Sequence, residues 1–202
     1  MFRRVTLLAL VGMLFLGLAS CGPGPAQETA KPAAEAPPPP KPVEQVPMYE
    51  LTKDAIMTHP DWTSRNITIL GVKLGDVTRN VEKNLGKLDN TRTLPEDYLT
   101  IYQNNGIFVY TVKLTGKAHQ VEIYKSFADK VADPKLKRLL TNGDAKYMRE
   151  LFGMEEKQEE NTEDNATEYS YDSRGFRFVQ YKVGGQVLNA LRLNELKKAS
   201  TT

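Results

Sequence analysis

Hydrophobic and polar positions follow a helical period in two short segments of the chain. In residues 75–86 apolar side chains recur every fourth residue from Val77, the spacing of one helix face. Residues 142–153 repeat this pattern, and both segments end in glycine, which accepts the left-handed conformation that commonly follows a helix. The pattern predicts two short amphipathic helices, with Val81 and Met148 at equivalent positions on their buried faces.

After each predicted helix, apolar residues recur at every second position, a pattern that indicates β-strands. An Asn-Gly pair ends at Gly106, and such pairs favour tight turns because both positions tolerate a positive φ angle. A second turn is expected at Gly116. The predicted strands are residues 98–102, 107–112, 118–124, 169–171, 176–181 and 187–193.

The two halves of the chain match at an offset of 69 residues. Gly106 and Gly175 are separated by this interval, and so are Gly116 and Gly185. Several matches at one offset indicate a tandem repeat. The repeats are predicted at residues 48–130 and 131–198.

The segments that lead into the repeated helices are less alike. Asp133 and Pro134 are typical of a helix start, with the acid as N-cap and proline in the first turn, and this helix should run through Leu140. Residues 52–57 are a candidate helix in the first repeat, whereas residues 67–72 have a strand pattern, and which form is ancestral stays open. The expected fold class is α+β. It consists of two tandem units, each a helix-loop-helix followed by an antiparallel sheet of three or four strands with helices on one face.

The first twenty residues have the layout of a secretory signal peptide. Arg3 and Arg4 precede an apolar run that is too short for a transmembrane helix, although an uncleaved signal anchor is the alternative. Cys21 is the only cysteine, and the residues from Leu18 to Cys21 resemble the bacterial lipobox. That resemblance implies cleavage before Cys21, a diacylglycerol and palmitate anchor on its thiol, and, with Gly22 next, an outer-membrane location facing the periplasm.

Residues 21–47 are expected to be a disordered tether. Nine of the twelve prolines lie between residues 22 and 47, and alanine, lysine and glutamate fill most of the rest. Such a segment cannot bury a core and favours an extended polyproline conformation. We expect it to hold the folded part away from the membrane.

Charge and side-chain chemistry exclude several classes of function. Of 27 Lys and Arg residues, Arg3 and Arg4 lie in the signal, so the remainder balances the 25 acidic residues. A neutral chain gives no reason to expect nucleic-acid binding, which needs clustered basic residues. The two histidines, His59 and His119, form no catalytic or metal-binding pattern, and no metal, cofactor or enzymatic activity is expected. Residues 155–168 carry seven acids without the glycine of a calcium loop, and are expected to be a solvated connector.

The repeat unit resembles the SmpA/OmlA (BamE-like) family of small bacterial lipoproteins. The resemblance rests on Gly75-Asp-Val-Thr followed by Val81, Leu85 and Gly86, then a tyrosine and a glycine-containing hairpin, over residues 67–195. Two tandem copies resemble the fold of the β-lactamase inhibitory protein. The chain departs from the family at Lys87, where a proline-containing turn is usual, and at Asn142, which replaces the first glycine. The resemblance implies a binding module and no particular site residue.

One face of the predicted sheet is the candidate binding surface. Alternation places Ile107, Val109, Phe176 and Phe178 toward the helices and the residues between them on the other side. Four residues of that other side are the binding candidates: Phe108, Tyr110, Arg177 and Tyr181. Tyrosine and arginine are common anchors of protein interfaces. The alternative is that the two repeats bury these faces against each other, or that loops cover them.

These observations predict a lipid-anchored protein-binding or scaffold module of the cell envelope, without catalysis. Its expected partners are the membrane, through the anchor, and an envelope protein whose identity the sequence does not give. The alternative function is an inhibitor of a periplasmic or secreted enzyme, which rests on fold analogy alone.

Overall fold

The computed structural model describes residues 46–196. Cys21, the signal peptide and nearly all of the predicted tether lie outside the described residues. These described residues belong to one compact unit. Within the described part, none of the helices is long and apolar enough to cross a membrane.

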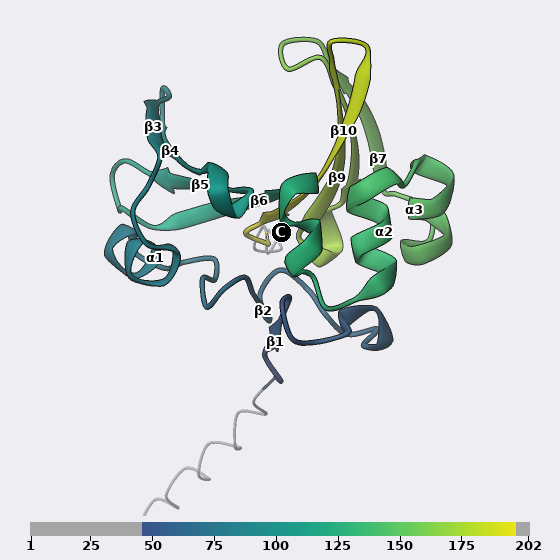
Figure 1. Cartoon of the computed structure of the whole chain (residues 1–202), viewed down its shortest axis with the longest axis horizontal. Helices are drawn as coiled ribbons and strands as arrows, with labels where there is room; N and C mark the ends of the chain where they lie inside the picture. The colour runs from purple at the N-terminus through teal and green to yellow at the C-terminus, as the bar shows by residue number, and fades with distance from the viewer. Residues whose placement is uncertain (1–45, 197–202) are drawn as a thin grey trace, which may run out of the picture. The chain divides into compact units, whose positions relative to one another are not determined.

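One antiparallel sheet of eight strands organises this unit (Figure 1). Its strand order is β3-β4-β5-β6-β10-β9-β8-β7, so each half of the chain contributes four consecutive strands. The halves meet in the middle of the sheet, where β6 pairs antiparallel with β10. The strands are β3 (Asn90–Thr93), β4 (Asp97–Tyr102), β5 (Ile107–Val112), β6 (Ala118–Tyr124), β7 (Lys157–Asn161), β8 (Ala166–Tyr171), β9 (Phe176–Val183) and β10 (Gln186–Asn194).

The remaining elements are short. A second sheet consists of the parallel strands β1 (Tyr49–Glu50) and β2 (Ile67–Thr68). The α-helices are α1 (Thr78–Leu85), α2 (Pro134–Asn142) and α3 (Ala145–Phe152). The 3-10 turns are η1 (Ile56–Thr58), η2 (Gln103–Asn105), η3 (Lys125–Lys130) and η4 (Asp172–Arg174).

Local sequence explains where the helices begin and end. The Asp133 carboxylate accepts hydrogen bonds from the backbone N–H groups of Lys135 and Leu136, which satisfies free donors at the start of α2. The Asp144 side chain caps α3 in the same way, and Gly86 and Gly153 end α1 and α3 with positive φ angles. The predicted positions of these three helices are confirmed.

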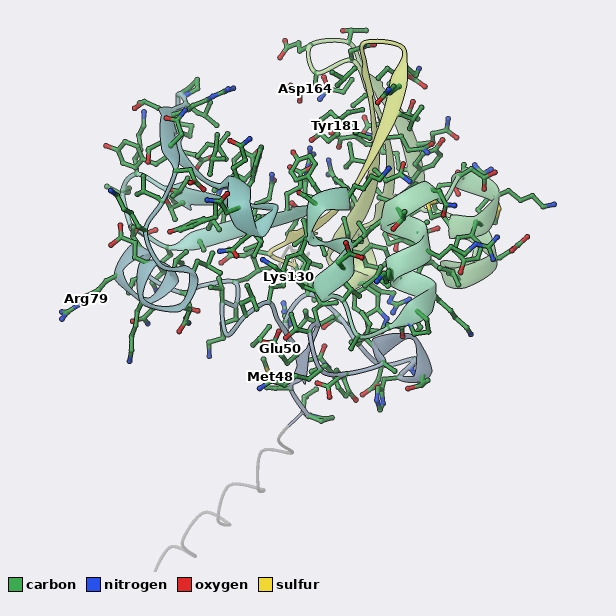
Figure 2. The ribbon with its side chains drawn as sticks, in the orientation of Figure 1. Met48, Glu50, Arg79, Lys130, Asp164 and Tyr181 are labelled. Carbon is green, nitrogen blue, oxygen red and sulfur yellow. The ribbon has the colours of Figure 1, made fainter. Side chains whose placement is uncertain are left out.

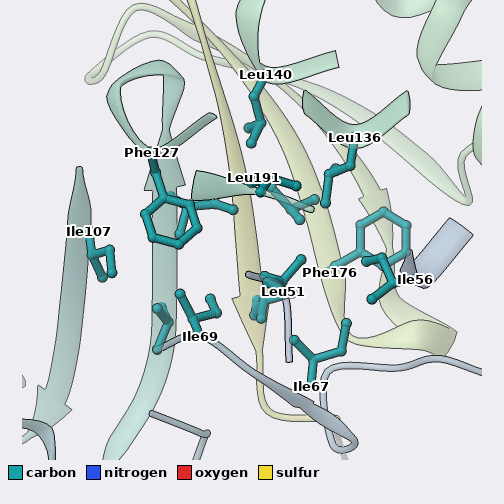
Figure 3. Packing of buried hydrophobic residues seen from close by; sticks show 14 of the residues in the cluster. Leu51, Ile56, Ile67, Ile69, Ile107, Phe127, Leu136, Leu140, Phe176 and Leu191 are labelled. Atoms are coloured by element: carbon teal, nitrogen blue, oxygen red, sulfur yellow. The ribbon is translucent and has the colours of Figure 1, made fainter. Parts of the chain in front are cut away.

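The main hydrophobic core lies between the helices and one face of the large sheet (Figure 3). Val81 of α1 and Met148 of α3 are fully buried in it, as predicted. Trp62, in the segment before α1, also enters this core, where its ring lies 4.8 Å from that of Phe176 and under the Arg174 guanidinium. The core residues shown in Figure 3 come from the N-terminal segment, the sheet, η3 and α2.

The predicted fold class is wrong. The strands do not form two separate three- or four-stranded sheets, because β6 and β10 join all eight strands into one mostly antiparallel β structure. Both junction strands carry apolar side chains toward the core, and pairing them buries these side chains together. Paired helix-loop-helix units do not describe the molecule, whose helices are few and short.

The candidate helix at residues 52–57 is also absent. The backbone N–H groups of Lys53 and Asp54 both donate to the Glu50 carbonyl, which makes a turn, and only η1 follows. Six residues before a His59-Pro60 pair are too few to stabilise an isolated helix, and a residue that precedes proline disfavours the helical conformation. The predicted strand at residues 67–72 shortens to β2 and an isolated bridge.

Residues 155–168 are not a simple connector. They contain β7, the turn after it and the start of β8. Strand β7 lies at the edge of the sheet and its residues are exposed or half-buried, so its charges stay in solvent. Charged residues are common on edge strands because they discourage pairing with another chain.

Candidate functional site

The sheet face opposite the helices is here called the open face. It comprises the strand residues that alternate with the core residues, and no helix of the described region packs on it. The pairing register places Phe108 opposite Glu122, Glu122 opposite Arg192, and Arg192 opposite Arg177. These four side chains form one row across the centre of the sheet, because paired residues project to the same side.

All four residues predicted for binding lie on the open face and are half-buried. Phe108 and Tyr110 belong to β5, whereas Arg177 and Tyr181 belong to β9. Strands β6 and β10 separate the two pairs. The two halves join edge to edge, so these faces do not bury each other, and they lie on the same side of one sheet.

A row of aromatic rings bridges the two halves. Tyr124 of β6 lies between the predicted residues, with ring centroids 4.6 Å from Phe108 and 5.9 Å from Tyr181. Tyr181 projects from β9 in the long β9–β10 hairpin (Figure 2). The structure therefore brings Phe108 and Tyr181 together only through Tyr124, which the sequence analysis did not single out.

Four charged side chains and one tyrosine form a hydrogen-bonded network beside these rings. Arg192 Nη1 donates to Glu168 Oε1 at 2.8 Å, and Arg177 Nη1 donates to the other oxygen of the same carboxylate at 2.9 Å. Arg192 Nη2 donates to the Tyr181 hydroxyl at 2.8 Å, and that hydroxyl donates to Glu122 Oε1 at 2.7 Å. Tyr181 thereby links the carboxylate of one half to the guanidinium of the other.

The network is buried although none of the helices in the described part of the chain covers it. Glu122 is 0% exposed, Glu168 5% and Arg192 8%. Complete burial raises the pKa of Glu122, and the attraction of Arg192 offsets only part of this effect. Burial alone would also raise the pKa of Glu168, but the charges and hydrogen bonds of Arg192 and Arg177 outweigh it and lower that pKa. The two acids of the network therefore differ in how readily they lose a proton.

Some polar atoms of the network have no protein partner. Glu122 Oε2, Arg177 Nε and Arg192 Nε are buried and make no hydrogen bond to the described residues. An unpaired buried carboxylate oxygen is costly, and this loss of solvation is the main cause of the raised pKa of Glu122.

Sequence reasoning missed Glu122, Arg192 and Tyr124 as members of this site. A charge between apolar residues, as in Val121-Glu122-Ile123, is the usual pattern of a strand with one solvated face. The available signal was that Glu122 and Arg192 are each the one charged residue, between apolar neighbours, in the last predicted strand of their half.

A cavity of about 800 Å³ opens at one end of the open face. Its apolar lining comes from four strands: Ile101, Phe108, Tyr124 and Leu188. Polar side chains lie at its margin: Asn90, Arg92, Gln103, Lys125, Ser126 and Asp129.

The remaining candidates for chemistry have structural surroundings. His119 Nε2 lies 3.1 Å from Asp97 Oδ1, and its partner in the described region is this carboxylate and not Glu122. The ring of His59 stacks on that of Tyr49, with centroids 4.4 Å apart. Within residues 46–196, no three His, Cys, Asp or Glu side chains are placed to hold a metal ion.

Comparisons with known proteins show no family for this chain. No family model and no curated protein matches it. A solved structure of a DUF4309 family protein, YjgB, from Bacillus subtilis is similar at 12% sequence identity with a TM-score of 0.46, covering 71% of this chain and 95% of that one. At this level the similarity assigns neither function nor site, and the resemblance to the SmpA/OmlA family stays a prediction.

Proposed function

We propose that the protein is a lipid-anchored module of the cell envelope that binds another protein through its open face. The lipobox and proline-rich tether of the sequence support the anchoring, and the open face supports the binding. The fold is not part of this proposal, because the predicted fold class of two separate helix-and-sheet units was wrong.

The observation that carries the proposal is a broad sheet face with aromatic and arginine side chains, over which no helix of residues 46–196 packs. Phe108, Tyr110, Arg177 and Tyr181 are each half-buried, so they are held in place and still accessible. Rigid aromatic side chains supply large contact areas at little cost in conformational entropy, and tyrosine and arginine dominate the energetics of many interfaces.

The charged groups on this face favour a structural role over a catalytic one. Glu168 and Arg192 bind each other, and Arg177 also binds Glu168. Their hydrogen bonds hold neighbouring strands in register and fix the hydroxyl of Tyr181. A rigid surface suits binding, because little freedom is lost when a partner docks.

Tyr110→Ala is the sharpest test of the binding face. Tyr181 is less suitable because its hydroxyl also holds Glu122 and Arg192. Co-purification from solubilised envelopes should identify a partner, and Tyr110→Ala should weaken its binding by about 2 kcal/mol. Tyr98→Ala is the matched control, since Tyr98 is an exposed tyrosine on the neighbouring strand, on the other face.

The outcomes separate the possible functions. Equal binding by the wild-type protein and Tyr110→Ala, with a lowered melting temperature for the variant, would show that Tyr110 serves internal packing. Capture of a single soluble enzyme that loses activity in the complex would support the inhibitor instead of the envelope module.

Anchoring has its own test. Cys21→Ser removes the predicted lipid attachment site, so labelled palmitate should enter the wild-type protein and not the variant. Equal labelling of both proteins would refute the anchor and leave the binding face untouched.

A further inference from the structure

We infer that the cavity on the open face binds a small amphipathic anion, with an apolar body inside the cavity and one acidic group at its margin. This inference is independent of the protein partner proposed above. It rests on the cavity's size, its apolar interior and the sign of the charges around it.

The size of the cavity fits a small molecule. Its volume of about 800 Å³ lies within the range of roughly 300 to 1,000 Å³ that is typical of ligand sites. Ile101, buried in β4, pairs with Phe108, and Leu188 and Tyr124 continue the apolar surface across β10 and β6. An apolar body placed there would cover side chains that are otherwise in contact with water.

The charge at the margin selects an anion. Arg92 and Lys125 are exposed and form no ion pair with any residue that the structure describes. The one acid of the lining, Asp129, is already paired, since Lys137 Nζ lies 2.9 Å from its carboxylate. The margin therefore carries two cations without acidic partners.

The polar margin also supplies neutral donors. The side-chain amides of Asn90 and Gln103 and the hydroxyl of Ser126 line the cavity beside the two cations. Amide and hydroxyl groups can hydrogen-bond an acidic head group, and charged donors make the stronger bonds. A carboxylate, sulfonate or phosphate group on an apolar body satisfies this arrangement.

Two fluorescent probes that differ by one charged group test the inference. Anilinonaphthalene sulfonate is an amphipathic anion, and phenylnaphthylamine has the same rings without the sulfonate. The protein used is residues 22–202, which contains the whole compact unit with its core. We expect the anion to bind with one-to-one stoichiometry and more tightly than the neutral probe, with the difference shrinking at high salt.

Substitutions separate the contribution of charge from that of the apolar lining. Arg92→Gln and Lys125→Gln should each lower the affinity for the anionic probe about fivefold and change the affinity for the neutral probe by no more than about twofold. Leu188→Ala should lower the affinity for both probes by similar factors, because it removes apolar contact alone. Arg79→Gln is the matched control: Arg79 is an exposed arginine that projects outward from α1 (Figure 2) and should change neither probe.

Competition identifies the source of the natural ligand. Displacement of the anionic probe by decanoate would support a free amphiphile, and displacement by vesicles that contain anionic lipid would support the same site acting on a bilayer. Failure of both competitors would overturn the inference. Equal affinity for the two probes, or unchanged anion binding by Arg92→Gln and Lys125→Gln with intact melting curves, would also overturn it.

Discussion

The two faces of the eight-stranded sheet are built from the same strands but bury different kinds of side chain. Toward the helices, β5 and β9 place Ile107, Val109, Phe176 and Phe178, which are all 0% exposed. On the face away from the helices lie Glu122 of β6, which is also 0% exposed, and its neighbours in the charged network.

The contrast shows that burial on the open face comes from the sheet itself. Figure 1 shows the sheet bending across its width, so that β3 and β4 stand apart from β9 and β10. The rings of Tyr124 and Tyr181 and the long side chain of Arg192 cover the carboxylates. The helix-covered face gains stability from apolar area, whereas the open face combines a small apolar cluster of Ala166, Val179 and Ala190 with charges that must stay paired.

The largest expected effect is on the helix-covered face. Met148→Asp places a charge without a partner in the core and should cost several kcal/mol of unfolding free energy, enough to unfold the protein or its second half. Val81→Asp should behave alike in α1. Lys146→Asp, at an exposed position of α3, is the control and should leave the thermal melt nearly unchanged. A normal melt for Met148→Asp would contradict the assigned core.

Removing the central cation of the open face should come next. Arg192→Ala leaves Glu122 and Glu168 buried without their shared partner, and should cost about 3 to 5 kcal/mol in denaturant unfolding. Arg177→Ala should cost clearly less, because its side chain is 28% exposed and water can replace it. Equal costs for the two variants would mean that the network is open to solvent.

A single hydroxyl should have a smaller effect. Tyr181→Phe keeps the ring and removes the group that bonds both Glu122 and Arg192, so we expect a loss of about 2 kcal/mol. Tyr98→Phe removes a hydroxyl from a residue that is 44% exposed and should leave the free energy of unfolding unchanged. If both variants melt like the wild type, the hydroxyl does not link the two halves.

The smallest effects should be those of pH, and they differ in sign for the two acids. The raised pKa of Glu122 means that the folded state holds this proton more tightly. As pH rises above the ordinary Glu value of about 4.3, the wild type should lose stability relative to Glu122→Gln. The lowered pKa of Glu168 predicts the reverse: its contribution is present above that value and is lost as pH falls through the folded pKa. Parallel pH profiles of stability, each relative to the wild type, for Glu122→Gln and Glu168→Gln would contradict this difference.

Local pattern predicted the elements well, and the sheet poorly. Strands β5 and β6 have the predicted bounds, and Asp133 caps α2 as expected, because these features depend on neighbouring residues. Strands β3 and β7 were missed since their residues are polar and show no alternation. The joining of β6 to β10 was missed because pairing between residues some 70 positions apart leaves no local signal.

The candidate site was likewise predicted only in the part that depends on local sequence. Alternation placed Phe108, Tyr110, Arg177 and Tyr181 on one face, where the structure has them. The burial of Glu122 could not be predicted, because it depends on the bend of the sheet and on side chains from other strands.

The pair at the centre of the sheet has a consequence for assembly. Glu122 and Arg192 hold the same place in the two halves, each opposite the open-face residue of the preceding strand, and they face each other across the junction. If β6 paired in this register with the β6 of a second molecule, the two Glu122 carboxylates would face each other. If β10 paired with a second β10, the two Arg192 guanidinium groups would face each other. Like charges at a buried strand pair are strongly unfavourable, whereas the native pairing joins opposite charges. The ion pair therefore makes each half select the other half over a copy of itself.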